Sequence, residues 1–381
     1  MRLFRPVFAF ALALSACNGD VPPSAGAIAL FDTSPMRGDF FALPWPSDAR
    51  VKTDGNGRKH LDLTGLYNPG SAVGDYLQIF AADDLTGFGT SSAVFFRFDA
   101  PIDPGSLPPS AADSIAPGST AMIVDVTPKS PTFGRRQPLR ARFRHEHGDY
   151  IGDDWLALLP EPGFPLREKT TYAALLTDGI RTKNGGAPVR ADSRFTMPAV
   201  SLPLDIDPAH VVVATVFTTG DFTHTMRELR ESTYRYVPDP PLAADFEYAG
   251  AERNGAYDIY EGTYTAPNFQ EGDTPYLRNG GRIHLGDDGK PQPVRMESLR
   301  FALTVPRAKM PPGGWPIVLY AHGTGGDYRS FIDDRSALAA ANVRDDNGNT
   351  VSQMAMIGID QVLHGPRDPT DNDPAITFYN F

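Results

Sequence analysis

The chain has 381 residues, of which 41% are hydrophobic and 21% charged, a composition that suits a globular protein of two or three domains. Its net charge of −11, with no basic run to offset it, sets nucleic acid aside as a partner because an acidic surface repels phosphate. The single cysteine, Cys17, excludes disulfide bonds within the chain and any cysteine metal cluster.

The first residues are typical of an export signal. Arg2 and Arg5 precede an apolar stretch, Val7–Leu14, that is too short to span a bilayer. The sequence Leu-Ser-Ala-Cys over 14–17 follows, and it resembles the bacterial lipobox. In that family the signal peptidase cuts before the cysteine, whose thiol then carries diacylglycerol.

The lipobox resemblance implies a signal peptide over 1–16 and an acylated Cys17 that anchors the chain in a lipid membrane. Residues 17–29 are rich in Gly, Pro and Ser and are predicted to form a flexible tether. Asn18 stands where an Asp can retain lipoproteins of this kind at the inner membrane. The cell envelope is therefore the expected location, with the outer membrane favoured. A plain secretory signal with an incidental cysteine is the alternative.

The region 30–200 is predicted to be β-rich. Short apolar or alternating runs indicate strands at four places: Ser92–Phe98, Ala121–Val126, Trp155–Leu159 and Thr171–Thr177. Leu166–Asn184 resembles the bacterial Ig-like module of surface proteins, which has a Leu-x-x-x-Thr-x-Tyr strand followed by a glycine turn. That resemblance implies a β-sandwich from about Gly89 to Met197, which would bind, space or dock. Ahead of it, Leu43–Asp48 is proline-stiffened and resembles the opening of bacterial lipase-type lipoproteins.

The region 201–292 is predicted to connect two domains. Val211–Thr219 is a strong strand pattern. Phe222–Tyr236 has helical spacing, with Met226 and Leu229 on the apolar face. The polar, glycine-rich stretch Pro238–Gly289 suggests irregular hairpins, and no role is assigned to it.

The region 293–381 carries the signal for chemistry. Its pattern is a strand, a glycine loop, a helix and a second strand, which implies a parallel sheet covered by helices. The elements are an alternating strand at Arg295–Val305, an apolar strand at Trp315–Tyr320, the loop His322–Gly326, a helix-like stretch at Tyr328–Asn342 and a buried strand at Met354–Ile359.

An apolar strand followed by His-Gly and a glycine-rich loop resembles the oxyanion loop of α/β-hydrolase esterases and lipases. The resemblance implies that backbone amides of Gly323, Thr324 and Gly325 bind the negative oxygen of a tetrahedral intermediate, with His322 shaping the loop rather than acting as the base. Fixed donors at that oxygen are worth on the order of 3 kcal/mol each. The expected fold is thus multidomain, with an N-terminal Ig-like β-sandwich followed by a partial α/β-hydrolase parallel sheet with helices.

The loop after the second strand adds to this resemblance. Gly358-Ile359-Asp360, then His364-Gly365 and Arg367, is similar to the corresponding loop of bacterial lipase-like lipoproteins. Asp360 is expected to be structural, holding the loop through Arg367. His364 precedes any nucleophile, which is the wrong order for a triad base, so a loop role is expected for it.

The serine of such a hydrolase is missing. No Gly-x-Ser-x-Gly follows Gly326, and Ala375–Phe381 reads as the start of a further element. A truncated or split gene product is therefore expected, with little or no turnover of its own and an unpaired sheet edge. The substrate class of the completed enzyme would be an ester or lipid, and no cofactor is expected.

Two other functions compete with the incomplete serine hydrolase. The first is a surface lipoprotein that acts as a binding or scaffold module through its Ig-like sandwich. The second is a metal-dependent hydrolase that uses four histidines: His145, His147, His322 and His364. Nothing in their spacing indicates that they converge, and His145-Glu146-His147 looks like a solvated turn, so no metal is expected.

Overall fold

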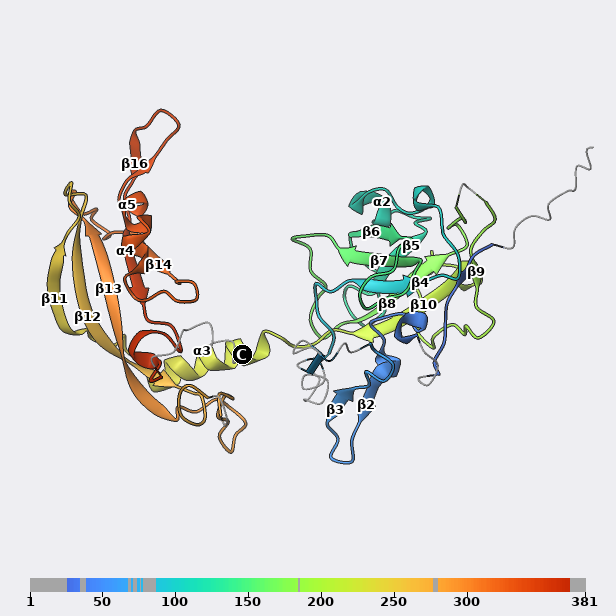
Figure 1. Ribbon diagram of the computed structural model, residues 1–381, viewed down its shortest axis with the longest axis horizontal. Coiled ribbons are helices and arrows are strands. Elements are labelled where there is room, and N and C mark those ends of the chain that lie inside the picture. The colour runs from blue at the N-terminus through green and yellow to red at the C-terminus, as the bar shows by residue number, and fades with distance from the viewer. Residues whose placement is uncertain are drawn as a thin grey trace, which may run out of the picture. The chain divides into compact units, whose positions relative to one another are not determined.

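The computed structural model describes residues 26–34, 39–67, 70, 74–75, 77, 87–183, 186–276 and 280–370. The chain is mostly β-structure and divides into two compact units, Met1–Phe222 and Thr223–Phe381 (Figure 1). The signal peptide, Cys17 and Ala375–Phe381 lie outside the described residues. Within the described ranges, no helix has both the length and the apolarity to cross a membrane.

Two three-stranded antiparallel sheets form the body of the first unit (Figure 1). In one sheet the central strand β7 (Trp155–Pro160) pairs with β4 (Val94–Arg97) and β6 (Leu139–Arg144). In the other the central strand β8 (Thr171–Thr177) pairs with β5 (Ala121–Asp125) and β10 (Val211–Thr218). The strands predicted from the sequence in this unit are thereby confirmed.

One hydrophobic core joins these two sheets. It receives Phe96, Leu156 and Leu158 from the first sheet, and alternate residues of the second sheet such as Ile123 and Leu176. All five side chains are fully buried. Since each large apolar side chain contributes roughly 1.5–3 kcal/mol on burial, this shared core is a major source of stability for the unit.

The sheet of β5, β8 and β10 is buried on both faces. Met122, Val124 and Leu175 point away from the shared core and form a second cluster with Ile206 and the half-buried side chains of the 195–202 segment. Burial on both faces explains why these strands are continuous apolar runs and do not alternate with polar residues.

The proline-stiffened segment Leu43–Asp48 links the two sheets. The backbone of Trp45 pairs with Phe95 of β4, and the carbonyl of Pro46 accepts a 2.7 Å hydrogen bond from the hydroxyl of Thr215 in β10. The carboxylate of Asp48 accepts from both the amide (2.9 Å) and the hydroxyl (2.8 Å) of Thr218. This segment therefore fastens an edge strand of one sheet to an edge strand of the other.

The short elements of this unit begin at polar caps. Each 3-10 turn follows an Asp or Ser whose side chain accepts from the amide two residues on. These turns are η1 (Phe40–Ala42), η2 (Asp48–Arg50), η3 (Pro104–Ser106) and η4 (Pro208–His210). The remaining elements are the parallel pair β1 (Ile28–Ala29) and β9 (Arg190–Ala191), the hairpin β2 (Val51–Thr53) and β3 (Lys59–Leu61), and α2 (Ala111–Ile115).

The tether predicted over 17–29 needs a correction at its end. Ile28–Ala29 form β1, and the side chains of Ala27 and Ala29 are buried in the shared core. Small apolar side chains fit closely between strands, so the end of the segment that its Gly, Pro and Ser content predicted to be flexible is instead packed.

The second unit is built on a five-stranded mixed sheet (Figure 1). Its order is β11 (Ala244–Ala251), β12 (Tyr257–Asn268), β13 (Arg295–Pro306), β17 (Ala355–Ile359) and β14 (Ile317–Tyr320). The first four strands pair antiparallel with their neighbours, whereas β17 and β14 run parallel. At the β14 edge the side chains of Ile317 and Leu319 are 64% and 69% exposed.

The irregular hairpins predicted over Pro238–Gly289 are part of a larger element: β11 and β12 form an antiparallel hairpin with two register shifts, and this hairpin belongs to the five-stranded sheet. β12 pairs with β13 over twelve consecutive residues, and β11 extends the same sheet, whereas β10 belongs to the first unit. β11 is an edge strand in which polar and aromatic residues alternate over Asp245–Tyr248, too short a run to mark the strand clearly. Phe246 and Tyr248 are more than half exposed, but both contact the ring of Tyr260 in β12.

The predicted helical stretches form with altered boundaries. α3 (His224–Tyr236) is a single helix, but its apolar face is largely exposed, Met226 by 67%. The stretch Tyr328–Asn342 contains two short helices, α4 (Ser330–Asp333) and α5 (Ser336–Ala340), separated at Arg335, whose φ of +68° interrupts the helix. Phe331 of α4 and Ala337 of α5 are buried in a core cluster with residues of the sheet. β15 (Val343–Arg344), β16 (Thr350–Ser352) and η5 (Gly365–Arg367) complete the unit.

Candidate functional site

Two parallel strands bring the two predicted loops together. β14 leads into His322–Gly326 and β17 leads into Asp360–Gly365, and both loops leave from the carboxyl ends of their strands. Loops at this edge of an open sheet are where ligands bind in α/β proteins. The described loop residues are joined by direct hydrogen bonds, so they form one site.

Two buried histidines tie the loops to each other. Nε2 of His322 accepts a 3.1 Å hydrogen bond from the amide of Gln361, and Nε2 of His364 accepts one of 3.1 Å from the amide of Gly325. Each Nδ1 lies 2.9 Å from a carbonyl, that of Gly323 for His322 and that of Val362 for His364. Because amides must donate and carbonyls must accept, both rings carry their proton on Nδ1.

These bonds decide what the histidines can do. Their ring centroids are 4.8 Å apart, and both side chains are buried, with His322 6% and His364 3% exposed. The lone pair of each Nε2 already accepts from an amide, so neither ring is free to take a proton from a nucleophile. Both histidines therefore take part in hydrogen bonds that hold the two loops together.

The glycines of the first loop have different constraints. Gly325 has a φ of +84°, a conformation that glycine adopts without strain, and the amide of Gly326 closes a turn by donating to the carbonyl of Gly323 at 3.0 Å. A Cβ at Gly326 would lie 2.8 Å from the hydroxyl oxygen of Ser330 and 2.9 Å from Cβ of His322, whereas one at Gly323 would meet nothing within 4 Å. Gly326 is therefore required by packing and Gly323 is not.

The three predicted oxyanion donors are not equivalent. The amide of Gly325 is engaged by His364, so in this arrangement it is unavailable to a ligand. Gly323 and Thr324 are exposed, and among the described residues the amide of Gly323 has no hydrogen-bond partner. Gly323 is thus the donor that an incoming anion can use without displacing a protein contact.

Asp360 was expected to hold the second loop through Arg367, but its carboxylate pairs with Arg300 instead. Arg300 of β13 donates from Nε to Oδ2 of Asp360 (2.7 Å) and from a terminal nitrogen to Oδ1 (3.1 Å), a bidentate pair. Asp360 is 1% exposed, and it also accepts from the amide of Tyr328 at 3.2 Å. The hydrogen bond to Asp360 raises the pKa of Arg300, which stacks over the ring of Tyr328 at 4.3 Å.

Arg367 holds the loop by another route. It donates to the backbone carbonyl of Asp360 (3.2 Å) and to the carboxylate of Glu297 (3.1 Å). Glu297 also accepts from Arg295 at 3.1 Å and from Asn268 at 2.5 Å. Residues of β12 and β13 therefore support the loop that faces the glycines.

Sequence reasoning missed Arg300, Glu297 and Glu261. Glu261 of β12 forms an ion pair with Arg329 and accepts from the hydroxyl of Tyr328 at 3.2 Å, which fixes the chain just after the glycine loop. A signal for these residues exists, because a charged side chain within an apolar strand requires a partner. The sequence does not identify that partner.

The His145-Glu146-His147 segment lies in the first unit. His145 pairs with Asp154 at 2.7 Å and His147 lies 3.4 Å from Asp153, both in exposed turns. Within the described residues no three His, Cys, Asp or Glu side chains are grouped in a way that could hold a metal ion. His322 and His364 are brought together, with their rings in contact and each Nε2 accepting from a backbone amide.

No family model matches the chain, and no curated protein matches it in sequence.

Proposed function

We propose that the chain is a lipid-anchored protein of the cell envelope, of the serine esterase or lipase type, whose second unit carries the oxyanion-loop part of an α/β-hydrolase domain. The observation that carries this proposal is the exposed amide of Gly323, held at the carboxyl end of β14 in a loop that His322 and His364 fix from two sides.

The strand arrangement supports the proposal. β14, the glycine loop, the helices α4 and α5 and then β17 follow one another along the chain, and β17 returns parallel to β14. This is the strand–helix–strand unit from which α/β domains are built.

The chemistry proposed for this loop is stabilisation of negative charge. Attack on an ester carbonyl places charge on the carbonyl oxygen, and a preorganised amide stabilises that oxygen more than it stabilises the ground state. The amide of Gly323 is the first donor and the exposed Thr324 the neighbouring candidate, while Gly325 supports the loop through His364.

The nucleophile is not part of the proposed site. The sequence from Asp327 to Phe381 contains no Gly-x-Ser-x-Gly, and both loop histidines are occupied by backbone bonds. We therefore expect little or no ester turnover from this chain, since only binding and charge stabilisation remain without a serine.

Two measurements test this proposal. Hydrolysis of p-nitrophenyl butyrate and labelling by a fluorophosphonate are expected to be at background for the 381-residue chain. Labelling of the purified chain would show that it contains a reactive serine and overturn the predicted inactivity.

The membrane anchor is proposed from Cys17 alone. Acylation at this residue, together with removal of 1–16, would place the protein in the cell envelope, the outer membrane being favoured. Metabolic labelling with a fatty-acid analogue checks the proposal, and Cys17→Ala is expected to abolish the label. A label that persists in Cys17→Ala would exclude Cys17 as the only acylated residue.

A second candidate function is a binding or scaffold module in the first unit, which we propose to be an Ig-like sandwich. Two antiparallel sheets over one core support that description. The observation that favours binding is a small pocket on this unit, lined by two arginines that form no ion pair within the described residues.

A further inference from the structure

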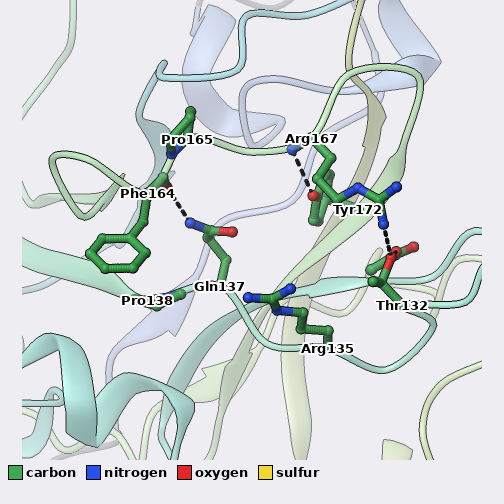
Figure 2. Close-up of a pocket in the computed structure, with 9 residues that line it drawn as sticks. Thr132, Arg135, Gln137, Pro138, Phe164, Pro165, Arg167 and Tyr172 are labelled. Atoms are coloured by element: carbon green, nitrogen blue, oxygen red, sulfur yellow. Dashed lines mark hydrogen bonds between the residues drawn. The ribbon is translucent and has the colours of Figure 1, made fainter.

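The pocket of the first unit lies between the loop that follows β5 and the segment that leads into β8 (Figure 2). Its volume is about 90 Å³. Polar and apolar side chains both line it: Asp125, Thr132, Arg135, Gln137, Pro138, Phe164, Pro165, Arg167 and Tyr172. All of its lining residues belong to the first unit.

The cationic groups of the pocket have spare hydrogen-bonding capacity. The guanidinium of Arg135 lies in the pocket (Figure 2) and, among the described residues, has no hydrogen-bond or ion-pair partner. Arg167 donates to the hydroxyl of Thr132, which leaves its other guanidinium N–H groups available. Arginine presents its donors in a planar fork that fits carboxylate and phosphate oxygens.

The one carboxylate of the pocket does not neutralise these arginines. Asp125 is 2% exposed, and its oxygens accept from the hydroxyls of Thr132 (2.7 Å) and Ser130 (3.0 Å) and from the amide of Thr127 (2.8 Å). Burial raises the pKa of Asp125, but these hydrogen bonds together hold it below its ordinary value, so the group is ionised. Two arginines against one carboxylate leave the pocket with a net positive charge.

A buried donor completes the set. Tyr172 is 3% exposed, and its hydroxyl oxygen accepts a 3.0 Å hydrogen bond from the amide of Arg167 (Figure 2). Burial raises the pKa of Tyr172, so the hydroxyl keeps its proton. No acceptor for that proton exists among the described residues, and a buried hydroxyl without an acceptor is costly.

The rim of the pocket is apolar. The side chain of Phe164 is 55% exposed, and Pro138 and Pro165 lie beside it (Figure 2). Gln137 donates to the carbonyl of Phe164, which holds this residue in place. An aromatic ring exposed beside a charged pocket offers a face for the apolar part of a ligand.

We propose that this pocket binds an oxyanion, a carboxylate or a phosphate, carried on a small aromatic or apolar body. The anion would accept from Arg135, Arg167 and the hydroxyl of Tyr172, and the body would pack on Phe164. A volume of about 90 Å³ holds roughly three waters, which is the size of such an anionic group. This ligand class rests on the proposed binding function of the first unit and does not depend on whether the second unit belongs to an esterase.

Ligand-observed NMR and calorimetry on the full chain test the site. The probes are benzoate, phenyl phosphate and the neutral benzamide, which share one ring. We expect at least one anion to bind roughly tenfold or more tightly than benzamide, and the tighter of the two anions identifies the preferred group. Arg135→Gln is expected to weaken that anion roughly tenfold, because it removes charge-assisted hydrogen bonds. Tyr172→Phe is expected to weaken it several-fold.

The matched control is Arg142→Gln, which removes an exposed arginine of β6 that does not line the pocket. It is expected to leave all three affinities unchanged, since a surface charge outside the site makes no contact. Binding of benzamide as tight as that of both anions, no binding by either anion, or equal loss in Arg135→Gln and Arg142→Gln would each overturn the proposal. The ester assay is independent of these results, so failure of one proposal is distinguishable from failure of the other.

Discussion

Nε2 of His364 accepts a hydrogen bond of 3.1 Å from the amide of Gly325, so a side chain of the second loop occupies one of the amides that the sequence assigned to an oxyanion. The same type of bond runs in the opposite direction from the amide of Gln361 to His322. The two loops are thereby fixed by a reciprocal pair of histidines, and Gly323 is presented by a rigid support.

His364→Ala is expected to destabilise the second unit by about 2 kcal/mol. The substitution removes a buried ring and leaves the amide of Gly325 without its acceptor. Urea unfolding followed by tryptophan and tyrosine fluorescence measures the change. His147→Ala is the control, because its side chain is 80% exposed, and it is expected to change stability by less than about 0.5 kcal/mol. Equal effects of the two substitutions would contradict the proposed tie.

Gly326→Ala and Gly323→Ala are expected to differ although the two glycines share one loop. A Cβ at 326 would overlap Ser330 and His322, so we expect a loss of about 1–3 kcal/mol, whereas a Cβ at 323 has free space and should cost much less. Thermal unfolding of both variants provides the comparison. If Gly323→Ala is the more damaging of the two, the described loop geometry is wrong.

Local pattern is sufficient to predict much of the fold. Ala121–Asp125 and Val211–Thr218 are apolar on both faces and form strands, and the alternating run of β13 forms a strand of the second unit. The order of strand, glycine loop, helix and strand also places His322 and Asp360 at the same sheet edge, as their positions after β14 and β17 indicate.

Long-range pairing is what the sequence leaves open. The carboxylate of Asp360 pairs with Arg300, which is sixty residues away in the sequence. Nothing in the local sequence indicates that Arg300 is its partner and that the nearer Arg367 is not. The occupied amide of Gly325 likewise depends on His364, which is thirty-nine residues away. β11 is exposed along most of its length, so its short alternation of polar and aromatic residues does not show that it pairs with β12.

Arg300→Met is expected to destabilise the second unit by roughly 2 kcal/mol. It leaves the buried carboxylate of Asp360 without its bidentate partner, and the full cost of breaking a buried pair is reduced because the side chain of Arg300 is 38% exposed. Arg307→Met is the matched control, since Arg307 pairs with the more exposed Asp258, and a much smaller change in stability is expected.

The double substitution Arg300→Met with Asp360→Asn tests the cause of that loss. Removing the unpaired buried charge is expected to recover part of the stability, because an amide is less costly to bury than a carboxylate. Urea unfolding of the single and double variants completes a cycle. If the double variant loses more unfolding free energy than the two single variants lose together, an unpaired buried charge is not the reason for the effect of Arg300→Met.

The pair of His145 and Asp154 should give the first unit a pH-dependent contribution. The hydrogen bond that Nδ1 of His145 donates to the carboxylate of Asp154, followed by the charge of that carboxylate, raises the pKa of His145 above the ordinary value of 6.5. A histidine whose pKa is raised on folding stabilises the fold below its ordinary pKa, and this contribution is lost as pH rises through the raised value. Asp154→Asn, which suits the φ of +56° at this position, is expected to lower the midpoint of His145 in an NMR titration. His210, whose pKa is raised by its hydrogen bond to Asp178, serves as the internal reference and should keep its titration midpoint. An unchanged midpoint for His145 would show that Asp154 does not raise the pKa of His145.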